Sequence, residues 1–220
     1  MAVAPIDQFN TAVVAADALV RMYVELRRTR GLGARGPLNA ENIDLLWLPR
    51  SAVVATLSAL DAYVHHVLHE RLPVIVKGLA PPPEALLSRL AETLPIRNAG
   101  TFKDALPFLA AHDTLDQVIL RLEDKTLRFQ TYQSPEKIEE AYELIGKDQI
   151  FAQVAAIWPG PPQDIKRRLS NYCRRRNQIA HEGDLEPNGV SRPMQPRYAD
   201  ECREFVGSLV SRLNRVMYGV

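Results

Sequence analysis

Apolar side chains recur along most of the chain at spacings of three and four residues, the period of an α-helix with one buried face. The clearest run covers residues 6–30, and its apolar positions are Ile6, Phe9, Val13, Leu19, Val20, Tyr23 and Leu26. A second run covers residues 41–71, and its expected buried face is Val53, Leu57, Leu60, Val64, Val67 and Leu68. Pro49 predicts either a kink or a fresh helix start near the beginning of this second run.

Proline and glycine divide the remaining chain into shorter helices. The spacing predicts helices over residues 83–94, 101–110, 112–128, 148–157, 164–182 and 197–217. One more helix has a cap at Ser134, a first residue at Pro135 and an end at Gly146. Since no convincing strand pattern occurs, we expect an all-α single domain over residues 1–220. Its long helices lie in 1–72 and 148–220, with a helical insertion at 73–147.

Composition excludes some classes of function. The net charge of +1 gives no attraction of the whole protein to nucleic acid, so any such attraction has to be local. Cys173 and Cys202 form no metal or redox pattern. The N-terminus lacks the pattern of a signal peptide, and we expect no apolar stretch long enough to span a bilayer. The expected location is the cytoplasm, without a membrane partner.

Residues 166–176, with the sequence KRRLSNYCRRR, concentrate positive charge. The six cations are Lys166, Arg167, Arg168, Arg174, Arg175 and Arg176. Cations near the C-terminus of a helix are stabilised by the helix dipole, which could explain the second triplet. The first triplet lies near the start of the predicted helix, where the dipole disfavours it. A local surface suited to the phosphates of RNA is therefore indicated.

Arg176, Asn177 and His181 form the candidate catalytic group. On a regular helix Arg176 and His181 diverge by roughly 140°, whereas Asn177 and His181 share a face, so Asn177 could hold the imidazole. Gly183 is expected to end the helix, and the backbone there could turn His181 towards Arg176. An imidazole can move a proton and a guanidinium can bind a phosphate, so RNA could be cleaved by its own 2′-hydroxyl without metal or cofactor.

The segment Arg176-Asn177-Gln178-Ile179-Ala180-His181 resembles the Arg, polar residue and His motif of the HEPN superfamily. The segments RRRNQIAHEGD, LSALDAYVHHVLHERL and FQTYQSPEKIEEAYELIG look like its RiboL-PSP-type branch, over roughly residues 45–190. The resemblance implies a helical bundle with metal-independent ribonuclease activity and a homodimer whose two Arg/His pairs line one cleft. It also implies a role in defence or growth arrest, with an antitoxin or defence-system protein as partner. Gly183 stands where many of these proteins have a tyrosine, so no role of that tyrosine carries over.

The resemblance also suggests Asp61, from an early helix, as a residue that orients Arg176. The alternative is a carboxylate that only satisfies a buried arginine. His65, His66 and His69 invite a zinc interpretation, but no acidic or cysteine partner stands at ligand spacing, and a solvated helix edge is favoured. Glu182 and Asp184 could either tune His181 or simply be solvated at the helix end.

Three interpretations of the whole chain follow. The first is an endoribonuclease that leaves a 2′,3′-cyclic phosphate and a 5′-hydroxyl. In it His181 is the acid/base, Arg176 binds phosphate, and RNA is guided by Lys166, Arg167, Arg168, Arg174 and Arg175. The second is a non-catalytic HEPN module that binds RNA, a nucleotide or a protein. The third is a scaffold whose basic helix is merely solvated.

Overall fold

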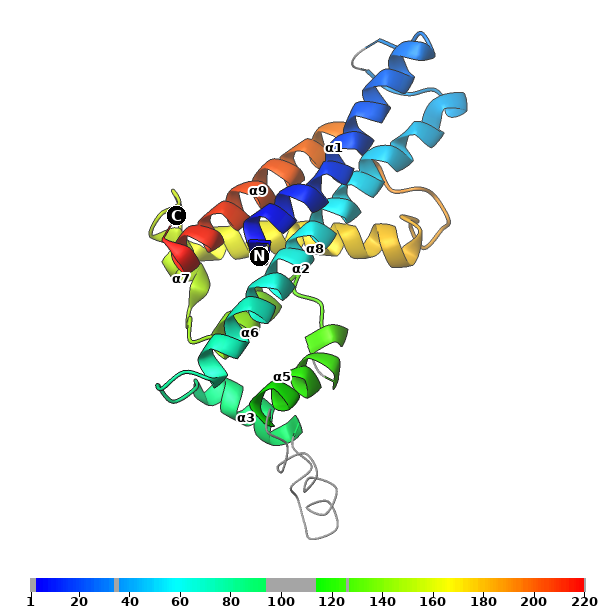
Figure 1. The fold of residues 1–220 in the computed structure, drawn as a ribbon. Coiled ribbons are helices and arrows are strands. Elements are labelled where there is room, and N and C mark those ends of the chain that lie inside the picture. Colours follow the sequence, from blue (N-terminus) through cyan, green and yellow to red (C-terminus); the bar gives the residue numbers. More distant parts are fainter. Residues whose placement is uncertain (1–2, 34–35, 94–113, 126, 220) are drawn as a thin grey trace. The chain divides into compact units, whose positions relative to one another are not determined.

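The computed structural model describes residues 3–33, 36–93, 114–125 and 127–219. Within these ranges the protein is all-α, and no named strand occurs, which confirms the predicted fold class. The elements are α1 (Pro5–Thr29), η1 (Ala40–Leu46), α2 (Trp47–Val76), α3 (Glu84–Thr93), α5 (Thr114–Lys125), η2 (Leu127–Phe129), α6 (Pro135–Leu144), α7 (Ile150–Ala155), α8 (Pro162–Glu182) and α9 (Pro196–Tyr218) (Figure 1). The helix predicted over 101–110 lies outside the described residues, as does the start of the one predicted over 112–128.

Most helix ends follow the signals in the sequence. Helices α1, α8 and α9 each have a proline in their first turn, where the missing N–H is not needed for the helix. The Ser134 hydroxyl accepts a hydrogen bond from the Lys137 amide (3.3 Å) and caps α6, as predicted.

The second predicted helix differs from the expectation at both ends. It begins as the 3₁₀ helix η1, and the α-helix starts at Trp47, so Pro49 lies in its first turn and does not kink it. At the other end α2 continues through Pro73 to Val76. All six positions of its expected apolar face are buried, which confirms that part of the prediction.

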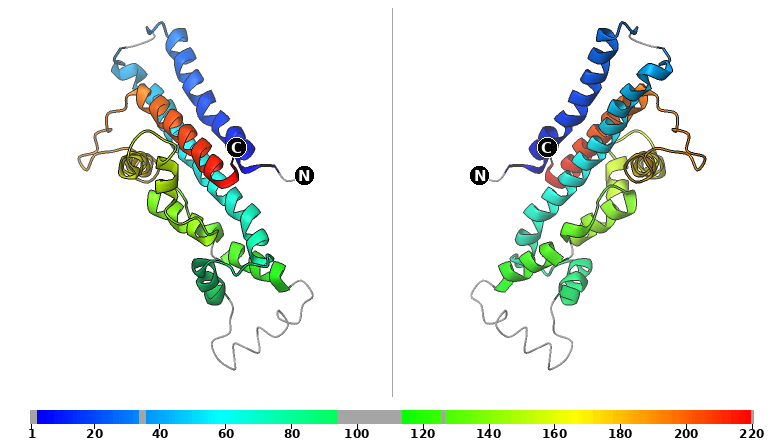
Figure 2. Two further views of the ribbon diagram at one scale, coloured as in Figure 1. Left: turned by 90° about the vertical axis from the view of Figure 1, so that its left-hand side faces the viewer. Right: turned by 90° about the vertical axis from the view of Figure 1, so that its right-hand side faces the viewer.

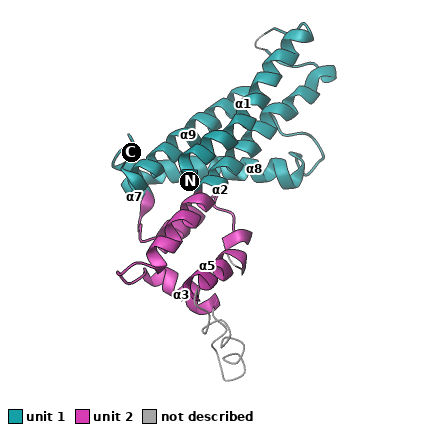
Figure 3. Cartoon of the chain, viewed as in Figure 1, with its two compact units in different colours: residues 1–63, 151–220 teal, residues 64–150 magenta. Residues whose placement is uncertain are grey.

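The chain forms two compact units, the first made of residues 1–63 and 151–220 (Figure 3). In this first unit α1 packs along α9, as Figures 1 and 2 show, and Asp17 of α1 forms an ion pair with Arg203 of α9. Helix α8 packs on α9 through the rings of Tyr172 and Phe205, whose centroids lie 5.5 Å apart. This packing holds α8, which carries the candidate catalytic residues.

The second unit covers residues 64–150 and contains the C-terminal part of α2 together with α3, α5, η2 and α6. Helix α3 contacts both α5 and α6, and η2 contacts α5. Its buried side chains include Leu68, Leu72, Leu86, Leu122, Ile138 and Tyr142. The expected insertion, residues 73–147, falls within this unit.

Residues 40–76 are long and apolar enough, by length and composition, to cross a membrane, contrary to the expectation from the sequence. Half of the most apolar window of this stretch is buried inside the structure itself. The core helix of a soluble protein has these same features, so the stretch is weak support for a membrane span.

Candidate functional site

The C-terminal end of α8 exposes His181. The helix stays regular through Glu182 and ends at Gly183, whose φ of +64° lies in the left-handed region that glycine adopts without strain. The next amide, that of Asp184, donates a hydrogen bond to the Gln178 carbonyl oxygen (2.9 Å) and closes the cap. Gly183 therefore ends the helix as predicted, but the backbone does not turn His181 out of the last helical turn.

Arg176 nevertheless reaches His181 through its long side chain. The Arg176 Nη1 lies 3.2 Å from His181 Nε2 and 3.1 Å from Asn177 Oδ1. A guanidinium can only donate, so Nε2 accepts and the imidazole proton in this contact sits on Nδ1. The structure thus joins three of the candidate residues at one exposed position. Asn177 meets the guanidinium here, and a contact of Asn177 with the imidazole stays a prediction.

The Arg176 guanidinium has N–H groups that make no hydrogen bond within the described residues. Its Nε is buried, and no hydrogen-bond partner for it occurs among the residues that the structure describes. The recorded bonds of the group all use Nη1. The buried Nε is closed to an incoming anion, so an anion at this helix end would meet the positive charge and the N–H groups of Nη2, as binding of a phosphate requires.

Two further cations lie on the same side of α8 as His181. Arg167, Arg174 and His181 are seven residues apart, and seven residues make about two helical turns, so the three form one line along the helix. All three are exposed. Arg167 makes an exposed ion pair with Asp164 (2.9 Å). For Arg174 no ion pair occurs within the described ranges. We call Arg167, Arg174 and His181 the exposed stripe of α8.

The other cations of residues 166–176 face elsewhere. Arg168 stacks on the rings of Phe205 (4.8 Å to the centroid) and Tyr172 (6.0 Å). Lys166 lies over the ring of Phe151, 5.6 Å from its centroid. Each of these contacts is a cation–π interaction that holds the side chain against the protein. RNA-guiding roles for Lys166 and Arg168 stay predictions, and neither residue lies on the exposed stripe.

Arg175 belongs to a buried ion cluster that the sequence did not reveal. Its Nη1 lies 2.5 Å from an oxygen of Asp184, and its Nη2 donates to the Pro193 carbonyl oxygen (2.9 Å). The Nε of Arg50, at the start of α2, also bonds to the Asp184 carboxylate. Asp184 is fully buried, and its φ of +58° is one that Asp tolerates better than most residues.

The buried cluster changes the interpretation of the two acids that follow His181. Asp184 is enclosed by two arginines, so it is not solvated at the helix end as one alternative held. Glu182 pairs with Arg192 (3.2 Å), which also binds Glu186 (2.9 Å). The recorded partners of both acids are thus arginines. The partner Arg50 stands far from residues 174–184 in the sequence, and no spacing rule links them.

The remaining candidates lie on α2. Asp61 is half-buried, and a role in orienting Arg176 stays a prediction, since the recorded partners of Arg176 are Asn177 and His181. His69 Nδ1 lies 2.8 Å from a carboxylate oxygen of Glu123, and His65 Nε2 lies 3.2 Å from the Gln130 carbonyl oxygen. His65 is partly buried and held by its contact, whereas His69 is largely exposed, as expected for a solvated helix edge. In the described residues, no group of three metal-ligating side chains gathers at one place.

Buried groups of the first unit show raised pKa values. Burial raises the pKa of Tyr172, and the neighbouring Arg168 opposes this shift by favouring the phenolate. Burial also raises the pKa values of Tyr198 and of the Cys202 thiol. In the second unit, burial lowers the pKa of His66, and His69 and His65 add to this effect. Each shift widens the pH range over which its group is neutral.

No family model matches the chain, and neither the curated proteins nor the solved structures compared with it gave a match. The fold therefore establishes an all-helical protein of 220 residues and no particular family.

Proposed function

We propose that this chain is a metal-independent endoribonuclease of the HEPN type. The observation that carries the proposal is the 3.2 Å contact between Arg176 Nη1 and His181 Nε2 at the exposed end of α8. In this proposal Arg176 binds the phosphate and His181 transfers protons, and cleavage of RNA by its 2′-hydroxyl needs two such groups side by side. The resemblance of residues 176–181 to the HEPN motif supports the same reaction.

The chemistry begins with the phosphate of the RNA displacing Arg176 from the imidazole. The guanidinium then binds the phosphate oxygens, and His181 Nε2 becomes free to accept the proton of the 2′-hydroxyl. The 2′-oxygen attacks phosphorus, and the bond to the 5′-oxygen breaks. The leaving oxygen takes a proton, so the products are a 2′,3′-cyclic phosphate and a 5′-hydroxyl. Arg176 stabilises the negative charge that grows on the phosphate during this step.

A homodimer completes this mechanism. One imidazole cannot accept a proton and donate another at the same moment, so a second His181 from a partner copy would supply the acid. The exposed stripe of α8 would guide the RNA backbone, with Arg167 and Arg174 as its phosphate-binding residues. A role in defence or growth arrest, under the control of a partner protein, is part of the same proposal.

A non-catalytic RNA-binding module is the second candidate. The observation that favours it is that Arg176 occupies the Nε2 lone pair of His181, the atom that has to act as base. If the guanidinium did not leave this position, the helix end would bind phosphate without turnover. The exposed stripe would then still give affinity for RNA.

Cleavage of mixed cellular RNA in excess EDTA, by the parent protein and by His181→Ala, separates these candidates. The proposal predicts cleavage by the parent alone and cyclic-phosphate ends on the products, while the variant binds RNA with similar affinity. Equal cutting by both proteins would point to another site or a contaminant and would contradict the proposal. Binding by both proteins without cutting by either would favour the module, and the absence of RNA affinity at moderate salt would favour the scaffold.

A further inference from the structure

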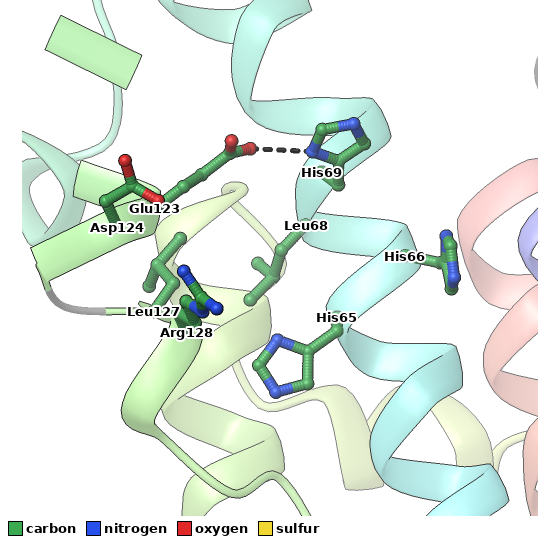
Figure 4. Close-up of a pocket in the computed structure, with 8 residues that line it drawn as sticks. All are labelled: His65, His66, Leu68, His69, Glu123, Asp124, Leu127 and Arg128. Carbon is green, nitrogen blue, oxygen red and sulfur yellow. Dashed lines mark hydrogen bonds and ion pairs between the residues drawn. The ribbon is translucent and has the colours of Figure 1, made fainter. Parts of the chain in front are cut away.

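A pocket of about 370 Å³ opens on the surface of the second unit (Figure 4). Helix α2 supplies one wall, and α5 and η2 supply the other. The lining residues are His65, His66, Leu68, His69, Glu123, Asp124, Leu127 and Arg128. Small-molecule sites in proteins measure roughly 300–1,000 Å³, so this pocket has the size for a small ligand. None of its residues belongs to the site on α8.

The floor of the pocket is apolar. Leu68 is 2% exposed and Leu127 is 5% exposed, and together they close the bottom between α2 and η2. Most of the pocket surface is contributed by apolar atoms. A ligand with an apolar body would remove this surface from water and gain affinity from doing so.

The histidines of the pocket differ in what they can offer a ligand. His65 is held by the Gln130 carbonyl and packs edge-on against the ring of Tyr132, with centroids 4.8 Å apart. His65 therefore shapes one side of the pocket, and its Nε2 is already engaged by the protein. In Figure 4 the ring of His66 points away from the other lining side chains. His69 donates from Nδ1 to the Glu123 carboxylate (2.8 Å), because a carboxylate can only accept. This bond orients the ring at the rim of the pocket, where the side chain stays largely exposed.

Arg128 supplies a fixed positive charge at the pocket. Its side chain lies next to Leu127 in Figure 4, on the side that faces Leu68. The residue is exposed, and no ion pair of Arg128 occurs among the residues that the structure describes. Glu123, which also lines the pocket, is bound by His69. The guanidinium can thus offer two parallel N–H donors above an apolar floor.

We propose that this pocket binds a small organic acid, with one carboxylate on an apolar or aromatic body. The carboxylate pairs with Arg128 and the body covers Leu68 and Leu127. A singly charged group fits better than a phosphate dianion, because Glu123 and Asp124 also line the pocket and repel a dianion about twice as strongly as a monoanion. Planar carboxylates match the fork of a guanidinium with two hydrogen bonds. The proposal does not depend on the reaction proposed for α8.

Titration of the full chain with phenylacetate and with phenylacetamide tests this directly. The two probes have the same body, and only the first carries a charge. The readout is the NMR shift of the methyl groups of Leu68 and Leu127 as the probe is added. For such a small acid we expect a dissociation constant on the order of 1 mM, about tenfold tighter than for the amide.

Three variants locate the binding. Arg128→Met should reduce the affinity for phenylacetate to that for the amide. Arg28→Met, which removes an exposed arginine of α1, should leave it unchanged. His181→Ala should also leave it unchanged, so a failure of the proposed ribonuclease would be distinguishable from a failure here. Equal binding of acid and amide, a preference that survives Arg128→Met, or the absence of Leu68 and Leu127 shifts at tens of millimolar (roughly the weakest range of interest) would overturn the proposal.

Discussion

Helix α8 carries two basic triplets of almost the same composition, and the structure uses them differently. The first triplet is residues 166–168 and the second is residues 174–176. Each has one cation on the exposed stripe, Arg167 in the first and Arg174 in the second. The other cations of the first triplet pack against aromatic rings. The other two of the second triplet bind a buried carboxylate and an imidazole.

This difference shows that position on the helix, and not residue type, decides what an arginine does. Residues one apart on a helix differ by about 100° in direction, so three consecutive arginines cannot share one face. In the second triplet only Arg174 is exposed, and the other two meet groups of the protein. In the first triplet Arg168 stacks on aromatic rings and is still exposed, like Arg167. For the second triplet the neighbours are Asp184 and His181, and this is why chemistry is expected there and not at the first triplet.

The largest loss of stability is expected when the acid that pairs with the second triplet is removed. The acid that pairs with the first triplet provides the matched control. Asp184→Asn leaves Arg50 and Arg175 buried without their anion, and breaking a buried pair in this way costs about 3 kcal/mol or more of unfolding free energy. The asparagine tolerates the positive φ of this position, so the backbone is not the cause. Asp164→Asn removes only the exposed partner of Arg167 and should cost less than about 1 kcal/mol. Urea denaturation of both variants measures the difference, and equal losses would mean that the buried cluster does not stabilise the fold.

A second prediction concerns the exposed stripe. Arg167→Ala together with Arg174→Ala should weaken RNA binding and reduce the slope of log affinity against log salt by about 0.7 per residue for a single strand. Arg168→Ala is the matched control, since that arginine is held against Phe205 and points away from the stripe. Fluorescence anisotropy at several salt concentrations measures the slopes. A larger loss for Arg168→Ala than for the pair would show that RNA follows the other side of α8.

The smallest effect is expected on the unfolding free energy at high pH, when Arg168 of the first triplet is replaced. Burial raises the pKa of Tyr172 while Arg168 opposes the shift, so Arg168→Met should raise this pKa further. A tyrosine whose pKa is raised by folding stabilises the protein fully below its unfolded pKa of about 10, and this contribution is lost as the pH rises above it. The unfolding free energy should therefore fall more steeply above pH 10 in Arg168→Met than in the parent. Absorbance titration of the tyrosines together with urea denaturation checks this, and an unchanged Tyr172 titration would show that Arg168 does not act on the ring.

The sequence predicted the fold class and most helix ends because both depend on local signals. The apolar spacing of α2, the Ser134 cap and the Gly183 end are each contained within a few residues. The sequence also indicated Arg176 and His181, although on a regular helix their side chains leave the axis in directions about 140° apart. It was the reach of a long side chain, and not a bend of the helix, that joined them.

Long-range partners could not be predicted in this way. Arg50 meets Asp184 across 134 residues, and no periodicity connects the two positions. The same holds for His69 and Glu123, 54 residues apart, which create the polar side of the pocket in the second unit. Such pairs depend on how whole helices pack. A sequence shows each member of such a pair as a polar or charged residue, and it does not show which residue is its partner.

The central claim is that Arg176 and His181 act as one catalytic unit, and cleavage rates of four proteins on one RNA in excess EDTA test it most directly. The four are the parent, Arg176→Ala, His181→Ala and the double variant. If the two residues act as a unit, each single variant should lose about 100-fold or more in rate, and the double variant should lose little beyond that. Parent-like rates in either single variant, or losses that multiply in the double variant, would contradict the claim.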